Sequence, residues 1–277
     1  MRGSMSDFTH PTGAQVAPFA IAAAYRFVPL ADGVSLRGQL LASASQAGLK
    51  GTVLLAEEGI NLTLAGAPAA LHGWLTDLQA DPRFAGLDIK HSQAGKPPFA
   101  RLKVKLKSEI IRMNQPTVRP AVARAPAVDT ATLTRWLVAG QCDEGRPLRL
   151  LDTRNAFEVD AGAFVGAIDW RLQRFSDFPA ALASHRAALE GCTVVSYCTG
   201  GIRCEKAALW MTEHGLPHVW QLDGGVLRYL ETQAETEGSG ATAPHWRGSC
   251  VVFDERGAVA ADLSPALACT PANAATA

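Results

Sequence analysis

One six-residue stretch, Cys198-Thr-Gly-Gly-Ile-Arg203, constrains the fold of this chain more than any other. It follows an apolar run at 193–197 that is typical of a buried strand, and it precedes a run at 204–213 that is typical of a helix. A cysteine at the end of a strand, followed by two glycines and an arginine, forms a loop whose backbone N–H groups converge on an anion. Such a loop lowers the pKa of a thiol, so the sequence predicts a nucleophilic thiolate at Cys198.

Length and charge limit the classes of protein that the chain can represent. Its 277 residues suffice for two domains of ordinary size. The formal net charge is zero, so any nucleic-acid binding needs a local basic patch. The sequence holds no run of about 18 apolar residues and no secretion signal, so we expect no membrane association and a cytoplasmic location.

The cysteines and histidines do not suggest a metal site. The chain has six cysteines, and a long chain without a secretion signal favours free thiols over a disulfide framework. No Cys-x-x-Cys pair is present. His214 and His218 are four residues apart, but Gly215 and Pro217 lie between them, so the two histidines do not share a helix face. The glycine motifs that bind nicotinamide, flavin or nucleotide phosphates are missing as well. We therefore expect no metal and no organic cofactor.

The first half of the chain predicts an α+β domain at 21–115. Its order of elements, β-α-β-β-α-β, is typical of a ferredoxin-like or acylphosphatase-like sandwich. The expected strands are 21–28, 51–55, 60–64, 87–92 and 99–111, and the expected helices are 30–48 and 67–80. We expect 1–20 to be a disordered leader, in which 1–4 resemble an expression-vector sequence and Met5 is the natural start.

The second half predicts an α/β domain at 129–238, which follows a proline-rich linker at 116–128. Helical stretches separate most of its short apolar runs, a pattern typical of a parallel sheet with helices on both faces. Those runs are 148–151, 167–169, 193–197 and 219–222. The segment 239–277 is polar and rich in glycine and alanine, so we expect it to be largely disordered, with local order at 246–259.

The length of the cysteine loop distinguishes two classes of thiol enzyme. Tyrosine-phosphatase loops have the spacing Cys-x5-Arg, and the present loop is one residue shorter. It resembles the loop of the rhodanese sulfurtransferases, in which the cysteine carries a persulfide. Two flanking motifs support this resemblance, because they occur in the same order as in that superfamily. They are Asp152-Thr-Arg154 with Glu158 and Phe164-Val-Gly-Ala167, and Leu222-Asp-Gly-Gly-Val226.

Further stretches narrow the resemblance to one family. Segments 25–30, 51–61, 99–111 and 198–207 together resemble the tRNA uridine(34) hydroxylase family, and the resemblance spans 21–259. It implies an N-terminal α+β domain joined to a rhodanese domain. It also implies oxygen-dependent conversion of the wobble uridine of bacterial tRNA to 5-hydroxyuridine, with molecular oxygen as co-substrate. The implied partner is the anticodon loop of tRNA, with no DNA partner.

The cysteine loop supplies the first candidate site residues. We expect Cys198 to be catalytic, as a persulfide or another covalent sulfur intermediate. The guanidinium of Arg203 either braces the loop or binds an anionic group of the substrate, and both alternatives stay open. The residues between them form the active-site loop and act mainly through backbone N–H groups. They are Thr199, Gly200, Gly201 and Ile202.

Four nearby side chains are candidate supporting residues. Cys204 would resolve an oxidised catalytic thiol as a disulfide, but we favour a small buried helix residue. Asp152 and Arg154 end a buried strand, where we favour an internal ion pair with Glu158 over a role in chemistry. Lys206 lies in the first turn of the expected helix, and we favour a solvated side chain over contact with an anion.

A basic stretch marks candidate RNA contacts. Arg101, Lys103, Lys105 and Lys107 alternate with apolar residues, so a strand would place all four cations on one face. Such a face can bind RNA phosphates. A solvated face or an edge strand protected by lysine explains the same pattern. The residues alone favour this second explanation, and the family resemblance makes the two equal.

Two enzymatic functions follow from these patterns. The first is hydroxylation of tRNA, and the alternative is a thiosulfate-type sulfurtransferase that works through a cysteine persulfide. The loop alone predicts both equally. The fused N-terminal domain favours the hydroxylase, because a transferase with a small donor does not need a basic strand. A non-catalytic binding module is a third possibility, and the intact Cys198 argues against it.

Overall fold

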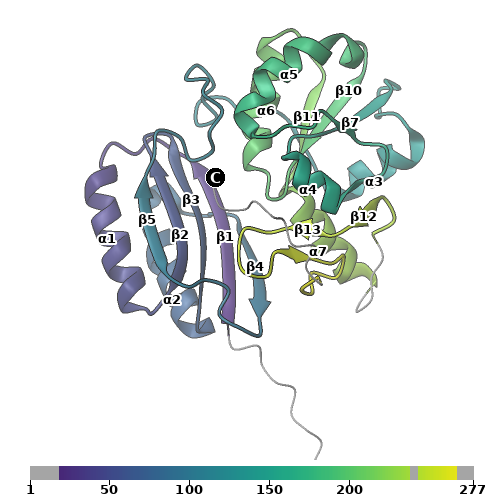
Figure 1. Ribbon diagram of the computed structural model, residues 1–277. Coiled ribbons are helices and arrows are strands. Elements are labelled where there is room, and N and C mark those ends of the chain that lie inside the picture. The colour runs from purple at the N-terminus through teal and green to yellow at the C-terminus, as the bar shows by residue number, and fades with distance from the viewer. Residues whose placement is uncertain (1–18, 238–242, 267–277) are drawn as a thin grey trace, which may run out of the picture.

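The computed structural model describes residues 19–237 and 243–266. Of the expected leader at 1–20, residues 1–18 lie outside the described residues, as does Cys269, whereas residues 19 and 20 begin a strand and are not disordered. Two α/β units stand side by side, and the C-terminal segment lies between them at one end (Figure 1). Among the described residues, no helix has both the length and the apolar character that crossing a membrane requires.

The N-terminal unit is a five-stranded sheet with helices on one face. The strand order is β4-β1-β3-β2-β5, in which β5 pairs with β2 in parallel and the other pairs are antiparallel. The strands are β1 (Phe19–Phe27), β2 (Lys50–Ala56), β3 (Gly59–Gly66), β4 (Ile89–Ala94) and β5 (Leu102–Leu106). The helices are α1 (Gly33–Gln46), α2 (Pro68–Gln79) and the short turn η1 (Pro82–Phe84). This arrangement confirms the predicted α+β sandwich.

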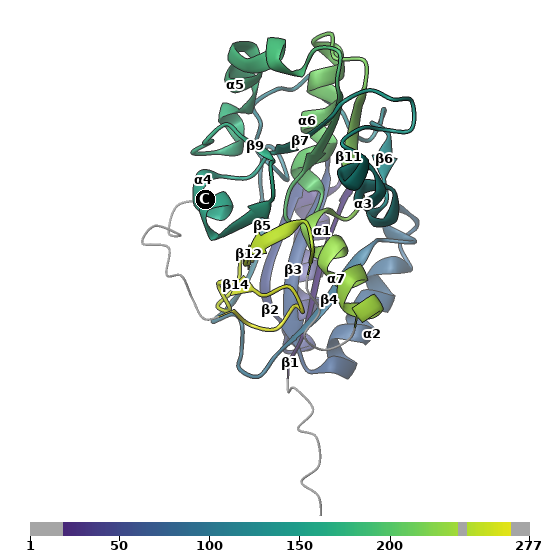
Figure 2. The same ribbon diagram turned by 90° about the vertical axis from the view of Figure 1, so that its right-hand side faces the viewer.

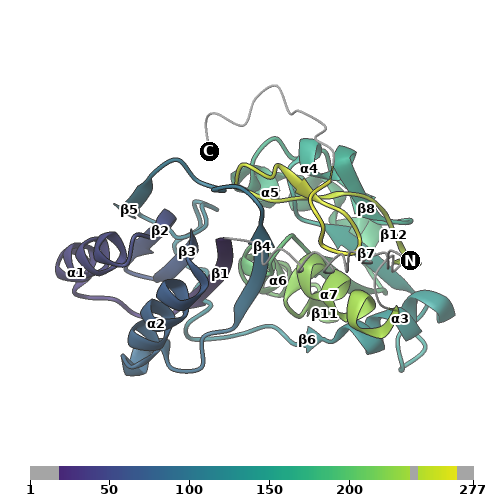
Figure 3. The ribbon, with the colours of Figure 1, turned by 90° about the horizontal axis from the view of Figure 1, so that it is seen from below.

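The two faces of β1 explain how the N-terminal unit meets the second one. Ala22 and Ala24 are buried in the core that α1 and α2 cover. Because side chains alternate along a strand, Tyr25 and Phe27 point to the opposite face. Figure 3 shows α1 and α2 on one side of this sheet. Helix α6 (Ile202–Glu213) of the second unit lies on the other side. The side chains of Tyr25 and Phe27 therefore belong to the junction between the units.

The second unit is a parallel sheet, as predicted, and its five strands have the order β6-β11-β10-β7-β9. The sequence did not predict the short strand β6 (Ala127–Val128). Val195 of β10 packs in the core on the side of α3 (Thr130–Ala139) and α7 (Gly225–Glu237), and Val194 packs on the side of α5 (Phe178–His185) and α6 (Ile202–Glu213). The strands are β6 (Ala127–Val128), β7 (Leu148–Asp152), β9 (Ile168–Asp169), β10 (Thr193–Tyr197) and β11 (Val219–Leu222). The helices are α3 (Thr130–Ala139), α4 (Ala156–Ala161), α5 (Phe178–His185), α6 (Ile202–Glu213) and α7 (Gly225–Glu237), with short turns η2 (Phe175–Asp177) and η3 (Arg186–Leu189).

The C-terminal segment is expected to have local order at 246–259. Within its described residues, 243–266, this order is present, because Trp246, Cys250 and Val259 are buried in the core of the second unit. Strand β12 (Trp246–Gly248) pairs with β8 (Gly162–Phe164), and β13 (Cys250–Val251) pairs with β14 (Ala258–Val259). Figure 2 shows this segment lying across the N-terminal sheet. The guanidinium of Arg256 donates to Ser92 Oγ of β4 at 3.0 Å, so the segment contacts both units.

The predicted strand at 99–111 is also shorter than expected. Only Leu102–Leu106 forms β5, and Arg101 and Lys107 lie outside it. Beyond Lys107 the chain turns, because the Glu109 carboxylate accepts the backbone N–H groups of Met113 and Asn114, both at 2.9 Å. The turn directs the chain from the edge of the N-terminal sheet towards α6.

Candidate active site at the Cys198 loop

The Cys198 loop lies at the carboxyl end of β10, between β11 and β7, where parallel sheets place their sites. Cys198 has no exposed surface. The backbone N–H of Gly201 donates to Cys198 Sγ at 3.1 Å. Gly201 has a φ of +100°, a conformation that L side chains rarely adopt. The glycine therefore lets the chain turn into α6 while its amide faces the sulfur.

The downstream glycine motif holds the loop from the side of α7. The backbone N–H groups of Val226 and Leu227 donate to the carbonyl oxygens of Cys198 and Thr199, at 2.9 and 3.0 Å. A Cβ at Gly225 would stand 2.4 Å from the Cys198 carbonyl oxygen, so only glycine permits this approach. The second glycine of the motif thus has a packing function at the loop.

The surroundings of Cys198 favour its thiolate. Burial raises the pKa of the thiol, but the hydrogen bond from Cys204, the charge of Arg203 and the backbone N–H groups of Arg203 and Gly201 together lower it below the ordinary value. Burial and the neighbouring Cys198 raise the pKa of Cys204. Thr153 Oγ1 lies 3.7 Å from Cys204 Sγ. The surroundings therefore favour the thiolate at Cys198 and the protonated thiol at Cys204.

Arg203 makes a buried ion pair with Glu158 of α4. Arg203 Nη1 lies 2.6 Å from Glu158 Oε2, and Arg203 Nη2 lies 2.8 Å from Glu158 Oε1. Thr199 Oγ1 and the backbone N–H of Asn155 also donate to this carboxylate, at 3.2 and 3.0 Å. Burial alone would raise the pKa of Glu158, but the charge and hydrogen bonds of Arg203, the charge of Arg154 and the N–H of Asn155 together lower it. Of the two alternatives for Arg203, these contacts support a bracing role. The sequence had not predicted Glu158 as a residue of this site.

The predicted ion pair of Arg154 exists, but with a different partner. Arg154 Nη2 lies 2.6 Å from Asp152 Oδ2 and also donates to the Gly162 carbonyl oxygen at 2.6 Å. Neither charged side chain has exposed surface, and the guanidinium lies over the ring of Trp246 at 5.2 Å. The expected pairing with Glu158 is wrong, because that carboxylate binds Arg203 instead. Asp152 and Arg154 thus hold β7, β8 and the C-terminal segment together.

The interpretation of Lys206 as a solvated side chain is wrong. Its side chain is 1% exposed, and its ammonium contacts two carboxylates of the N-terminal unit, Glu58 and Glu109. The adjacent Glu205 is also buried and accepts a hydrogen bond from the hydroxyl of Tyr25 at 3.3 Å. No local pattern predicts these contacts, because Lys206 and the hairpin that carries Glu58 are 148 residues apart in the sequence.

The basic stretch lies at the outer edge of the N-terminal sheet. Strand β5 is the edge strand opposite to β4. Arg101, Lys105 and Lys107 are exposed, and Lys103 is half-buried. Among the described residues none of these four side chains makes an ion pair. Both explanations of the stretch, an RNA contact and a protected edge, agree with this position.

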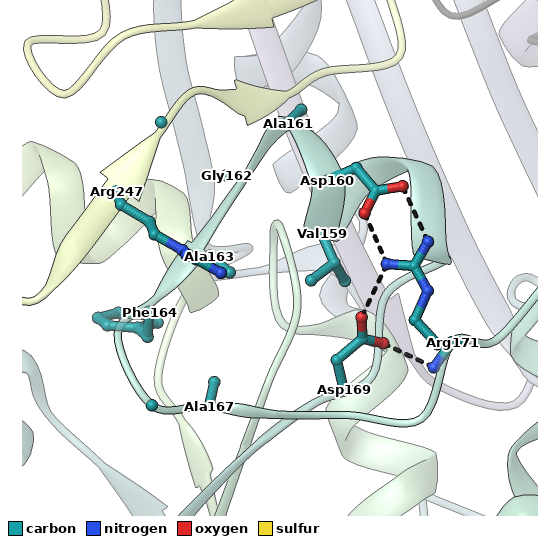
Figure 4. Close-up of a pocket in the computed structure, with 12 residues that line it drawn as sticks. Val159, Asp160, Ala161, Gly162, Ala163, Phe164, Ala167, Asp169, Arg171 and Arg247 are labelled. Atoms are coloured by element: carbon teal, nitrogen blue, oxygen red, sulfur yellow. Dashed lines mark hydrogen bonds and ion pairs between the residues drawn. The ribbon is translucent and has the colours of Figure 1, made fainter.

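A pocket of about 380 Å³ opens elsewhere on the second unit, beside α4, β8 and β12 (Figure 4). Arg171 lies on its wall and pairs with Asp160 and Asp169, at 2.6 and 3.1 Å. The side chain of Arg247 extends from β12 past Ala163. Cys198 does not line this pocket, so it is separate from the thiol site. Within 19–237 and 243–266, no group of three or more histidine, cysteine or acidic residues is arranged to hold a metal ion.

Comparisons with known proteins match both units. A family model described as the UPF0176 acylphosphatase like domain matches residues 19–110. A second model, described as a rhodanese-like domain, matches residues 134–232. The two matched regions correspond to the N-terminal sandwich and to the parallel sheet that carries Cys198.

Curated relatives match nearly the whole chain. A tRNA uridine(34) hydroxylase from Bordetella pertussis is 57% identical over 243 residues, which cover 88% of this chain and 96% of the relative. Proteins with the same name from Delftia acidovorans and Variovorax paradoxus are 55% and 54% identical, over 87% and 91% of this chain and 88% and 93% of their own lengths. The chain belongs to the tRNA uridine(34) hydroxylase family.

Proposed function

We propose that this protein hydroxylates the wobble uridine, U34, of tRNA to 5-hydroxyuridine, with molecular oxygen as co-substrate and Cys198 as the reactive group. Membership of the tRNA uridine(34) hydroxylase family supports the reaction. The single structural observation that carries the proposal is the Cys198 thiol, which accepts the N–H of Gly201 and has a lowered pKa. A preformed thiolate is the nucleophilic form of cysteine.

The side chains around Cys198 each have a distinct task in this proposal. Gly201 supplies an N–H donor to the sulfur, and Arg203 supplies a positive charge beside it. Glu158 fixes the guanidinium of Arg203 through two hydrogen bonds. Thr199, Gly200 and Ile202 complete the loop. Because the carboxylate holds Arg203, the positive charge stays in place throughout the reaction.

The substrate is proposed to be the anticodon loop of tRNA in the bacterial cytoplasm. Proteins that recognise RNA by sequence usually bind unstacked loop bases, which suits a wobble base presented to a buried thiol. Since Cys198 has no exposed surface, the base reaches the sulfur only when a neighbouring group moves aside. The cations Arg101, Lys103, Lys105 and Lys107 are proposed to contact the RNA backbone.

Mass spectrometry of tRNA nucleosides tests the proposed reaction. The strain that carries this chain would have its gene deleted, and then be complemented with wild type or with Cys198→Ala. We expect 5-hydroxyuridine and its derivatives to disappear on deletion, to return with wild type and to stay absent with Cys198→Ala. Unchanged 5-hydroxyuridine in the deletion strain would contradict the reaction. Full restoration by Cys198→Ala would contradict the role of the thiol.

One observation favours a second candidate, a thiosulfate-type sulfurtransferase. The spacing Cys-x4-Arg is that of loops that carry a persulfide, and the positive surroundings of Cys198 would stabilise a persulfide anion as well as a thiolate. Conversion of thiosulfate and cyanide to thiocyanate by the purified protein measures this activity. Strong turnover that Cys198→Ala abolishes would support the transferase, and no turnover would leave the hydroxylase as the better candidate.

A further inference from the structure

The first turn of α6 carries an ammonium that binds the other unit. Lys206 Nζ lies 2.8 Å from Glu58 Oε2 and 2.7 Å from Glu109 Oε2, and it donates to the Ile111 carbonyl oxygen at 3.1 Å. It also lies over the ring of Phe27, 5.8 Å from the centroid. These four groups all come from the N-terminal unit or the turn that follows it. Lys206 thus spans the junction although it belongs to the helix of the thiol loop.

The two carboxylates are themselves fixed in position. Glu58, in the turn between β2 and β3, accepts the backbone N–H of Ile110 at 2.7 Å. Glu109 accepts two backbone N–H groups of the turn after β5. Burial raises the pKa of Glu109, and the stronger combined effect of Lys206 and these N–H groups lowers it. The N-terminal unit therefore binds the ammonium of Lys206 with two carboxylates that backbone N–H groups hold in position.

A second buried contact restrains the same helical turn. Glu205 accepts hydrogen bonds from Arg124 Nε at 3.0 Å and from the Tyr25 hydroxyl at 3.3 Å. The Tyr25 hydroxyl is also close to the loop, because a Cβ built at Gly201 would lie 2.8 Å from it. Residues 205 and 206 are thus both held from outside the second unit. A buried ion pair costs much desolvation, and a specific geometry is one use for it.

The restrained turn is the one that controls the thiol. Gly201 and Arg203, which lower the pKa of Cys198, lie five and three residues before Lys206, at the N-terminal end of the same helix. The titratable groups around Cys198 are Arg203 and Cys204 of α6 and Tyr25 of β1, with Glu158 of α4 acting through Arg203. Lys206 Nζ contacts the N-terminal unit and not the sulfur, so its influence on the thiol must act through position.

We propose that Lys206 is a positioning residue, through which Glu58 and Glu109 of the N-terminal unit hold the first turn of α6 so that Gly201 and Arg203 face Cys198. The N-terminal unit then has a task besides contact with RNA: it sets the reactivity of the thiol. This inference rests on the proposed function, in which Cys198 is the reactive group. The reactivity of the thiol itself can be measured without tRNA or oxygen.

The test measures thiolate formation at Cys198 in the full chain. Ultraviolet absorbance of the thiolate is recorded against pH for each variant, minus the same variant with Cys198→Ser. We expect Lys206→Met to raise the pH midpoint by about one unit, which means about tenfold less thiolate below the midpoint. The pair Glu58→Gln with Glu109→Gln should raise it similarly, and Lys206→Arg, which keeps the charge, should restore part of the effect.

The matched control is Asp88→Asn. Asp88 is also a carboxylate of the N-terminal unit whose partner, Arg228, lies on the second unit at 2.7 Å. That partner belongs to α7 rather than to α6, so this variant should keep the wild-type midpoint. A purely structural role of Lys206 would lower the melting temperature and leave the midpoint unchanged.

An unchanged midpoint in folded Lys206→Met would overturn the inference. If this variant does not fold, the single changes Glu58→Gln and Glu109→Gln decide in its place, because each leaves one carboxylate on the ammonium. Failure of the proposed function has a different signature. In that case wild-type protein would leave U34 unmodified, while the dependence of the thiol midpoint on Lys206 would remain.

Discussion

Arg203 and Glu158 face each other through two hydrogen bonds, of 2.6 and 2.8 Å, and both side chains are buried beneath the Cys198 loop. The arginine closes the loop motif, and the glutamate belongs to the upstream motif on α4. Gly225 of the downstream motif packs against the loop carbonyls. The three sequence motifs therefore meet at one thiol, and each supplies a different part: a positive charge, its counter-charge and room for the backbone.

Glu158→Gln tests the ion pair. The change keeps the shape of the side chain and leaves the buried guanidinium of Arg203 without a counter-charge. We expect a loss of about 3–5 kcal/mol in the free energy of unfolding, because removal of one partner leaves the other charge buried and unpaired. Denaturant unfolding measures the loss. The control is Asp143→Asn, which removes an exposed ion pair with Arg135 and should change stability by too little to detect. A similar small effect at both sites would contradict the brace.

The lowered pKa of Cys198 predicts a specific dependence of stability on pH. In the unfolded chain the thiol holds its proton up to about pH 8.5, whereas the folded thiolate has already lost it. The unfolded state thus binds more protons in the window between the two pKa values, so stability rises with pH across it. The contribution is lost as the pH falls through the folded pKa. Unfolding curves of wild type and Cys198→Ser should therefore diverge across this window, and parallel curves would contradict a thiolate.

Gly225→Ala tests the close approach of α7 to the loop. The new Cβ would meet the Cys198 carbonyl oxygen at 2.4 Å, and the φ of +66° is itself unfavourable for alanine. We expect a loss of at least about 1–3 kcal/mol in stability and a loss of U34 hydroxylation, measured by unfolding and by nucleoside analysis. Gly38→Ala in α1 is the control, since nothing lies within 4 Å of its Cβ. That change should stabilise by about 0.5–1 kcal/mol, and a stabilising Gly225→Ala would refute the packing argument.

Local signals in the sequence predicted much of the fold. The sequence at 129–139 predicts a helix capped by Asp129 or Thr130, and the Asp129 carboxylate accepts the N–H of Thr132 at 2.7 Å. The sequence Ala56-Glu-Glu-Gly59 predicts a hairpin turn, and β2 and β3 pair there as a hairpin. Both features depend on residues within a few positions of each other. The strand alternation likewise predicted the parallel sheet, because the period of the apolar pattern is a local property.

The errors concern residues whose surroundings come from distant segments. Lys206 has the composition of a surface position, but Glu58 and Glu109 of the other unit bury it. The sequence indicates local order at 246–259 but not where this stretch packs, and in the structure Trp246 and Cys250 fill a core together with residues of α3, α7 and β10. Such pairings are set by the docking of one element on another, which no short window of sequence records. The candidate loop was predictable because all its residues are contiguous.

The basic stretch on β5 makes the last prediction. Lys103→Glu combined with Lys105→Glu reverses two charges on an edge strand that makes no ion pairs within the described part of the chain. If these cations contact RNA phosphates, tRNA binding weakens. The slope of the logarithm of the binding constant against the logarithm of salt concentration then falls by about two phosphate contacts. Titrations of tRNA at several salt concentrations measure both quantities. Arg149→Glu combined with Arg174→Glu, at two exposed sites on the second unit, makes the same change in net charge and serves as the control. Equal binding by the double variant and wild type at low salt would assign the lysines to protection of the sheet edge.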